Sequence, residues 1–454
     1  MSTRYVTATA AGAAFGGFLF GFDTSTMNAA IVGIRTSLTL GAAAVGFVAA
    51  IALIGCAVGA WFSGPLTSRW GRTRVMLFAG ATIGAGSLAV ALATDLILLG
   101  AFRFGTGLGI GAASAVVPGY IAEISPTTIR GRLGTFWQFA IVFGQFAGLL
   151  VGFLLTQWAG TEAEPLPFGG AAWRWMFAAV ALSAAVYILI VPRLPPSPHD
   201  LLRAANEGEA RALLARLGPD PIDEQIAVIQ HAVERTPGST SLRELRGSQL
   251  GLQPIVWTGI LLAAFQQLVG ISVVKTYSNT IWQAVGFSTA SAFTISMATV
   301  LVSIVSTVVA IGLMDRIARR TLLSIGAAVM AISLSALAWS FSTATGNGQE
   351  LSLDRAAGIS ALVAINVFAV AFGITWGPVM WLMLSELFDT HVRVTAVGVC
   401  TAVNWLTNWA VSRMFPVLAG SGLELAYGLY AAFAALAFLF ALRVLPETRG
   451  RNLS

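Results

Sequence analysis

The stretch LGAFRFGTGLGIGAASAVVPGYIAEISPTTIRGRLGTFWQFAIVFGQFAG, residues 99–148, decides the fold. It holds two apolar runs, each long enough to cross a bilayer as a helix, joined by a short turn that carries Glu123, Arg130 and Arg132. Arg103 lies inside the first run. Because a charge within hydrocarbon costs about 2.5–3.5 kcal/mol on insertion scales, this arginine requires a partner and indicates a functional site.

The composition is that of an integral membrane protein. Of 454 residues, 56% are hydrophobic and only 10% are charged, against about 25% charged in soluble domains. The net charge of +6 sits in short loops, so membrane topology explains it and nucleic acid is not an expected partner. Both cysteines lie in apolar runs, and neither a metal site nor a cofactor is predicted.

Twelve apolar runs of bilayer-spanning length predict twelve transmembrane helices, at residues 9–33, 43–66, 73–94, 97–121, 132–156, 171–191, 251–276, 290–314, 321–342, 357–384, 394–418 and 424–445. Arginines concentrate in the loops after the second, fourth, eighth, tenth and twelfth runs. The positive-inside rule puts these loops and both termini in the cytoplasm, and we expect a multi-pass protein of the cell membrane.

One long polar segment divides the chain. Residues 195–249 open with three prolines, and 199–217 and 221–235 read as helices. We therefore expect an all-α membrane protein with two six-helix halves and a cytoplasmic helical linker. The predicted divisions are 1–194 (first half), 195–249 (linker), 250–446 (second half) and 447–454 (cytoplasmic tail).

Three motifs recur in order about 250 residues apart, which indicates a duplicated six-helix unit with a binding site at the midplane between the copies. The pairs are RWGRTR (69–74) with DRIARR (315–320), YIAEISPTTIRG (120–131) with WLMLSELFDTHVRV (381–394), and RLPPSP (193–198) with VLPETRG (444–450).

The motifs resemble the sugar porter family of the major facilitator superfamily over nearly the whole chain. The matching stretches are GGFLFGFDTS (16–25), GPLTSRWGR (64–72), RFGTGLGIGAASAVVPGYIAEISPTTIRG (103–131), FQQLVGISVV (265–274), TWGPVMWLMLSELF (375–388) and PETRG (446–450). The resemblance implies the major facilitator fold, alternating access by rocking of the two halves and a monosaccharide substrate. It implies a transporter rather than an enzyme, and we expect it to act as a monomer.

The sequence departs from the family pattern at several positions. In the inner loops the family usually has an acid, a glycine, and Glu, Arg and Trp where this chain has Ser68, Ala318, Pro196, His199 and Asp200. We expect these changes to weaken the contacts between inner loops that close the cytoplasmic side. Two usual asparagines are replaced by Ser272 and Ser303, and these shorter side chains leave the identity of the sugar open.

Asp23 is the expected partner of Arg103. Helical rise puts Asp23 about 22 Å up the first span and Arg103 about 30 Å above Glu123 on the fourth, so both lie in the outer half of the bilayer. Proton-coupled members of the family have an Asp and an Arg at these positions. If rocking changes their distance, Asp23 could load a proton facing out and release it facing in. The alternative is a static ion pair that holds two helices together.

Amides and indoles form the predicted sugar site, because amides match hydroxyl groups and an indole offers a flat apolar wall. Family positions and depth estimates select Gln138, Gln266, Gln267, Trp376, Asn404 and Trp405, with Asn408, Phe20 and Phe22 close by. Gly373, Gly377 and Pro378 would let the tenth span bend as a gate. The alternatives are interhelical hydrogen bonding for each amide and an interfacial belt for each tryptophan.

The charged inner loops are predicted to form salt bridges between the halves that close the cytoplasmic side. The candidates are Arg69, Arg72, Glu123, Arg130, Arg316, Arg319, Glu386, Arg393 and Glu447. The alternative is that these charges only orient the chain. For Lys275, near the outer end of the seventh span, we favour snorkelling to the interface over a role in an outer gate.

These features predict import of a monosaccharide, with a hexose such as glucose favoured, by proton symport. The alternatives are a uniporter, a proton-coupled pentose (xylose) or inositol porter and, from another class, a membrane sugar sensor.

Overall fold

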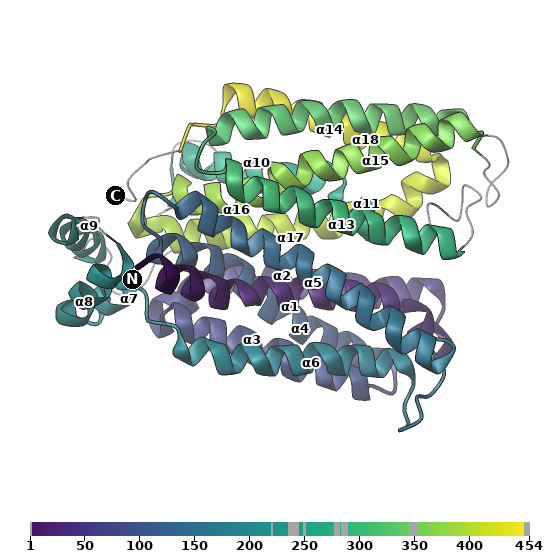
Figure 1. The fold of residues 1–454 in the computed structure, drawn as a ribbon, viewed down its shortest axis with the longest axis horizontal. Coiled ribbons are helices and arrows are strands. Elements are labelled where there is room, and N and C mark those ends of the chain that lie inside the picture. Colours follow the sequence, from purple (N-terminus) through teal and green to yellow (C-terminus); the bar gives the residue numbers. More distant parts are fainter. Residues whose placement is uncertain are drawn as a thin grey trace.

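The computed structural model describes residues 2–218, 221–234, 245–247, 251–276, 282, 289–344 and 353–448 (Figure 1). These residues are almost entirely helical, and an isolated β-bridge joins Pro165 to Ala171. The predicted boundary at 249–250 and the end of the tail, 449–454, lie outside the described residues.

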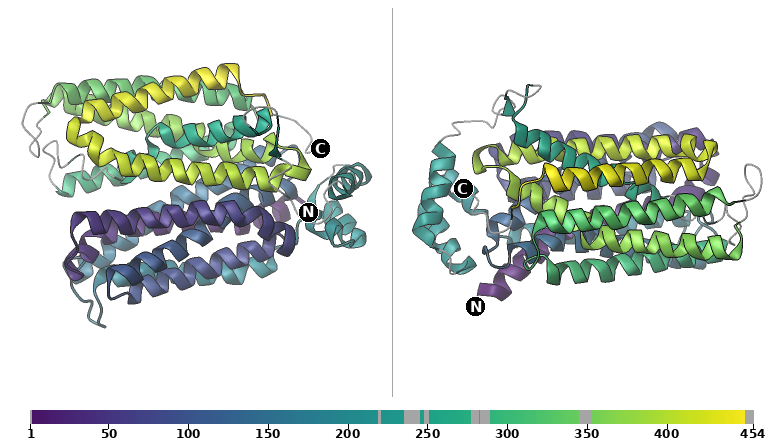
Figure 2. Two further views of the ribbon diagram at one scale, coloured as in Figure 1. Left: turned by 180° about the vertical axis from the view of Figure 1, so that it is seen from behind. Right: turned by 90° about the horizontal axis from the view of Figure 1, so that it is seen from above.

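Two bundles lie side by side along their length, one built before the linker and one after it (Figures 1 and 2). The first contains α1 Ser2–Ser37, α2 Ala42–Trp70, α3 Arg72–Leu92, α4 Leu96–Ile124, α5 Arg130–Ala159 and α6 Ala172–Ile190, followed by a 3₁₀ turn, η1 Val191–Arg193. The second contains α10 Pro254–Leu268, α11 Ile271–Thr276, α13 Thr289–Leu313, α14 Arg319–Ser342, α15 Arg355–Ile374, α16 Trp376–Leu387, α17 Thr390–Ser421 and α18 Leu423–Arg443.

The helices follow the predicted spans, with ends shifted by a few residues. Among the described residues, ten stretches are long and apolar enough to cross a membrane. The helices α13 and α17 occupy the predicted eighth and eleventh spans and complete the twelve-helix arrangement. The protein is therefore a multi-pass membrane protein of two six-helix halves.

Two spans of the second half are broken. The seventh divides at Gly270, whose φ of +82° and close approach to the ring of Tyr430 admit no side chain. The tenth divides at Thr375, between α15 and α16, which confirms the predicted bend beside Pro378. Each break frees backbone groups next to the amide-bearing residues described below.

Glycines let the helices that carry Asp23 and Arg103 pack closely. A side chain at Gly21 would overlap the backbone of Ile141, so α1 lies directly on α5. A side chain at Gly111 would overlap the backbone of Cys56, so α4 lies directly on α2. Close approach of this kind is how membrane helices gain packing energy.

The linker helices α7 Pro198–Arg203, α8 Glu207–Leu217 and α9 Ile222–Glu234 lie at the same end of the bundles as the start of α1 and the end of α18 (Figure 1). We call this the linker end. The prediction of one helix over 199–217 was wrong: Ala205 adopts φ +57°, and the Asn206 side chain accepts from the N–H of Glu209 to start α8 as a new helix.

Candidate functional site

Asp23 and Arg103 form a buried ion pair, as the sequence predicted. Arg103 Nη1 donates to both carboxylate oxygens of Asp23, at 2.7 and 2.9 Å. Both residues are almost fully buried, and the guanidinium also lies 5.7 Å from the ring centre of Phe177. The pair joins α1 to α4, so both partners belong to the first half.

Three amides of the second half hydrogen-bond to one another. Asn404 on α17 donates to Gln266 Oε1 at 2.9 Å and to the carbonyl of Ala263 at 2.8 Å. Gln267 Nε2 donates to Asn404 Oδ1 at 3.2 Å, and Gln266 Nε2 donates to the carbonyl of Trp376 at 3.1 Å. The amide cluster, Gln266, Gln267 and Asn404, therefore joins α10, α16 and α17 beside the Thr375 break.

Ser272 extends this cluster. Its hydroxyl donates to Gln267 Oε1 at 2.8 Å across the break between α10 and α11. The family usually has an asparagine here, and the serine reaches the same network through its single hydroxyl. Ser303 instead donates to the carbonyl of Thr299, within its own helix.

Both predicted indoles are buried, which does not fit a belt at the lipid interface. Trp376 Nε1 donates to the carbonyl of Leu323 at 2.9 Å. Trp405 Nε1 donates to Ser114 Oγ at 3.0 Å, which joins α17 of the second half to α4 of the first. Phe20 packs edge-on against Trp405 with ring centres 5.0 Å apart.

The remaining predicted sugar residues differ in placement. Gln138 on α5 is buried and lies against Gly377, beside the amide cluster, and its side-chain amide has no hydrogen bond to the residues that the structure describes. Asn408 Oδ1 accepts from Ser412 at 3.2 Å. Phe22 packs on Phe18 and against Gly148 of α5, not on Trp405.

Two charge clusters lie at the linker end. In the first, the guanidinium of Arg72 pairs with Glu123 and, at 2.9 Å, with Asp200, which also accepts the Arg72 backbone N–H at 2.8 Å. In the second, Arg319 lies 3.3 Å from Glu386.

The segment after α18 completes this second cluster. Glu447 accepts the backbone N–H groups of Arg319 and Arg320 at 3.0 and 3.1 Å. Thr448 donates to Glu386 at 2.7 Å. We call these groups the first and second charge clusters.

The predicted salt bridges between the halves are corrected here. Arg72–Glu123 and Arg319–Glu386 each lie within one half, because each arginine begins a helix beside the end of the helix that carries the acid. Arg69 and Arg316 are exposed.

Between the halves, the structure describes an ion pair that the sequence missed. Arg132 lies 3.6 Å from Asp315, whose carboxylate also accepts the Arg132 backbone N–H at 3.1 Å. Arg393 donates to the carbonyl of Phe388 and interacts electrostatically with Glu123 and Arg130.

Asp200 and His199 were not predicted as cluster members. His199 is buried, and its Nδ1 lies 3.6 Å from Glu123. Burial and the nearby Arg72 and Arg393 hold the pKa of His199 well below its usual value, so the ring is neutral. In this half Asp200 supplies a carboxylate to Arg72, and the expected weakening of the closure on this side stays a prediction.

Lys275 does not snorkel. Its Nζ donates to Gln145 Oε1 at 3.0 Å, which joins α11 of the second half to α5 of the first. Gln145 was missed as a partner, although it lies seven residues after Gln138 and therefore on the same helix face.

The fold and the buried polar residues define a class: a secondary transporter with the major facilitator fold. The chain belongs to the sugar transporter family, since its residues 9–454 match the family described as "Sugar (and other) transporter".

Individual relatives agree. A "Glucose transport protein" from Synechocystis sp. is 38% identical, with 97% of this chain and 94% of the relative covered. The solved structure of the proton:xylose symporter XylE bound to 6-bromo-6-deoxy-D-glucose is 30% identical, with a TM-score of 0.88 over 100% of this chain and 98% of that one. The inward open conformation of the xylose transporter XylE from E. coli, 29% identical, gives a TM-score of 0.73 over 99% and 98%.

Proposed function

We propose that this protein imports a monosaccharide, with a hexose such as glucose favoured, by proton symport. It would act as a monomer in the cell membrane, with the linker end and both termini in the cytoplasm. The observation that carries the proposal is the buried Asp23–Arg103 pair in a bundle that also holds the amide cluster. The names of the glucose and proton:xylose relatives support the substrate class and the coupling ion.

The amide cluster has the chemistry that a sugar requires. Its amides already exchange hydrogen bonds, so a sugar hydroxyl could replace one contact without leaving a buried group unsatisfied. Gln138 faces the cluster from the other half and has a donor and an acceptor to offer. A sugar held by Gln138 and Gln266 would contact both halves, and could therefore favour the conformation in which the halves close on it.

The coupling mechanism needs one refinement. Because α1 and α4 belong to the same half, rigid rocking of the halves leaves the Asp23–Arg103 distance unchanged. We infer that conformation controls which side supplies water to Asp23, and that protonation releases Arg103 from the pair. In the present conformation Asp23 is only 1% exposed.

The similarity to XylE supports a conformation that is not inward open, because the sugar-bound structure matches better than the inward open one. The buried charge clusters at the linker end agree with closure on that side.

Uptake in proteoliposomes tests the proposal, with labelled hexoses, pentoses and inositol and with or without an inward proton gradient. Wild type should accumulate its sugar only with the gradient. Asp23→Asn should abolish accumulation and retain sugar exchange, because the amide cannot carry the proton. Asp95→Asn is the matched control, since Asp95 is an exposed helix cap at the start of α4.

Accumulation by Asp23→Asn equal to wild type would refute the coupling role. Wild-type uptake that ignores the gradient would favour the uniporter, and a preference for xylose or inositol would replace the hexose. Failure to exchange any of these sugars would refute the substrate class.

A further inference from the structure

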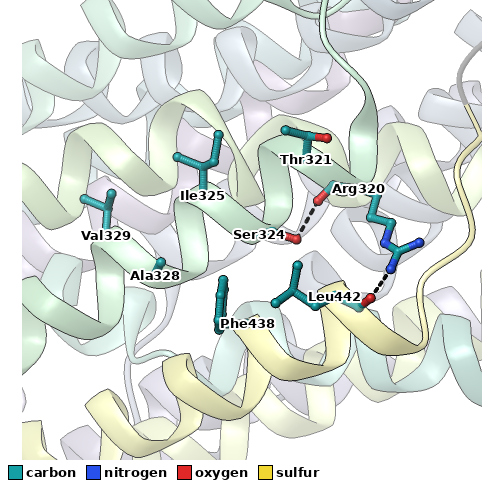
Figure 3. Close-up of a pocket in the computed structure, with 8 residues that line it drawn as sticks. All are labelled: Arg320, Thr321, Ser324, Ile325, Ala328, Val329, Phe438 and Leu442. Carbon is teal, nitrogen blue, oxygen red and sulfur yellow. Dashed lines mark hydrogen bonds between the residues drawn. The ribbon is translucent and has the colours of Figure 1, made fainter.

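A groove of about 660 Å³ lies between α14 and α18 at the linker end (Figure 3). Its volume is within the range of ligand pockets, about 300–1,000 Å³. The lining residues are Arg320, Thr321, Ser324, Ile325, Ala328, Val329, Phe438 and Leu442. The groove is thus apolar along most of its length and polar at one end.

This groove faces the lipid rather than the other half. Ile325 is 57% exposed and Leu442 is 39% exposed. The outward faces of the same two helices continue away from the linker end with exposed apolar side chains, including Ile332 and Leu436. In a membrane-spanning chain, exposed apolar faces of this kind contact acyl chains.

Arg320 closes the polar end. Its guanidinium donates to the backbone carbonyl of Leu442, which holds it across the groove from α14 to α18 (Figure 3). A guanidinium has five N–H donors, so several remain for an oxygen-rich ligand. The Ser324 hydroxyl donates to the Arg320 carbonyl and does not compete for the guanidinium.

One carboxylate lies nearby. Glu447 accepts the backbone N–H groups of Arg319 and Arg320 at the start of α14. Its charge therefore lies at the positive end of that helix. The guanidinium is exposed beside an apolar channel.

A second groove shows what the arginine adds. It lies between α3 and α4, has a volume of about 320 Å³ and is lined by Thr82, Ala85, Gly86, Ala89, Ala101, Phe102, Gly105 and Leu108. Its lining is uncharged, so it can accommodate lipid chains of any kind. The groove at Arg320 combines a channel for a chain with a cation for a headgroup.

We propose that the groove between α14 and α18 binds an anionic phospholipid, with an acyl chain along Ile325, Ala328 and Phe438 and its phosphate on Arg320. Basic pockets between membrane helices are known to bind anionic headgroups. A soluble anion would leave the apolar part of the groove unused, so the chemistry favours a lipid.

Native mass spectrometry of the full chain in detergent, with equal phosphatidylglycerol and phosphatidylcholine, tests this proposal. Wild type should retain phosphatidylglycerol preferentially. Arg320→Gln should weaken binding of phosphatidylglycerol about five-fold, which is the effect of one basic residue at a membrane surface. Binding of phosphatidylcholine should stay unchanged. Arg320→Lys should keep most of the preference, because it keeps the charge.

Two further variants distinguish binding through the lipid headgroup from binding through its acyl chain and from general surface charge. Ala328→Trp should fill the apolar part and lower retention of both lipids. Arg193→Gln is the matched control: Arg193 is an exposed arginine at the same end, donates to the carbonyl of Leu189 and lines no part of this groove. Sugar exchange by each variant verifies that the bundle folds.

Three outcomes would overturn the proposal. The first is phosphatidylglycerol retention by Arg320→Gln equal to wild type. The second is an equal loss in Arg193→Gln, which would indicate surface charge in general. The third is displacement of phosphatidylglycerol by inorganic phosphate, which would indicate a site for small anions.

Discussion

The two charge clusters at the linker end reach the same arrangement with different residues. In each, the arginine that begins the third membrane span of its half pairs with an acid on a neighbouring helix: Arg72 with Glu123, and Arg319 with Glu386. In each, a carboxylate from the segment that follows the half accepts the backbone N–H of that arginine. Asp200 fills this role in the first half and Glu447 in the second.

The difference lies in where this last carboxylate comes from. In the motif pair RLPPSP and VLPETRG, Glu447 aligns with Pro196, which has no charge to offer. Asp200, four residues later in the first turn of α7, replaces it. The duplication therefore preserves the geometry of the cluster rather than the residue position, and the first cluster incorporates the linker as a result.

Removing the buried acid of the second cluster should have the largest effect. Glu386→Gln leaves Arg319 buried without its charge partner, and loss of one partner of a buried pair costs about 3–5 kcal/mol. Thermal unfolding of the purified protein measures this. The exposed Glu209→Gln should stay within about 0.5 kcal/mol of wild type, and equal stability of the two variants would contradict the role of the pair.

Asp200→Asn should have an intermediate effect and test whether the clusters are equivalent. It removes a charged acceptor from Arg72, a loss of about 1.5–3 kcal/mol. Adding Pro196→Glu restores the residue that aligns with Glu447 and should recover much of the unfolding temperature. Pro196→Gln in the same background lacks the charge, and equal recovery with Gln would mean that the carboxylate is not what matters.

His199 should give the first cluster a pH dependence. Because burial and two arginines lower its pKa in the folded protein, the unfolded chain binds an extra proton below about pH 6.5. The free energy of unfolding should therefore be highest above that pH. It should fall below that pH by at most about 1.4 kcal/mol per pH unit. Unfolding temperatures of wild type and His199→Gln from pH 5 to 8 measure the difference, and a slope unchanged in the variant would exclude His199 as its source.

Thr448→Val should have the smallest effect. It removes one hydrogen bond to Glu386 and keeps the ion pair with Arg319, so we expect a loss of about 0.5–1.5 kcal/mol. The unfolding temperature should lie between those of wild type and Glu386→Gln. A loss as large as that of Glu386→Gln would mean that the threonine, and not the arginine, stabilises the acid.

Hydropathy and depth predicted most of the fold and the centre of the site. The twelve spans follow from run length, and Asp23 meets Arg103 because helical rise puts both at similar depth on neighbouring helices. The amide cluster follows from three polar residues at midplane depth, Gln266, Gln267 and Asn404. These predictions succeeded because a straight helix converts residue number into height.

Contacts beyond the straight helices were not predictable in this way. After α6 the chain passes through η1 and three prolines before Asp200 contacts Arg72 at the start of α3. Hydropathy does not predict the path of such a turn, so it could not show that position 200 rather than position 196 supplies the carboxylate. Lys275 follows the break at Gly270, so its direction could not be read from the register of α10. The roles of the site residues in transport remain predictions.

Lys275 follows Gln267 and Gln145 follows Gln138, so their contact joins the halves farther from the linker end than the amide cluster and must break whenever the halves separate on that side. Lys275 is also the only lysine in the chain. Apart from the amino terminus, the protein thus has a single primary amine. A small acylating reagent should modify Lys275 at a rate proportional to the fraction of time the halves stand apart on that side. The acylation rate of this lysine therefore reports how often that side of the transporter opens.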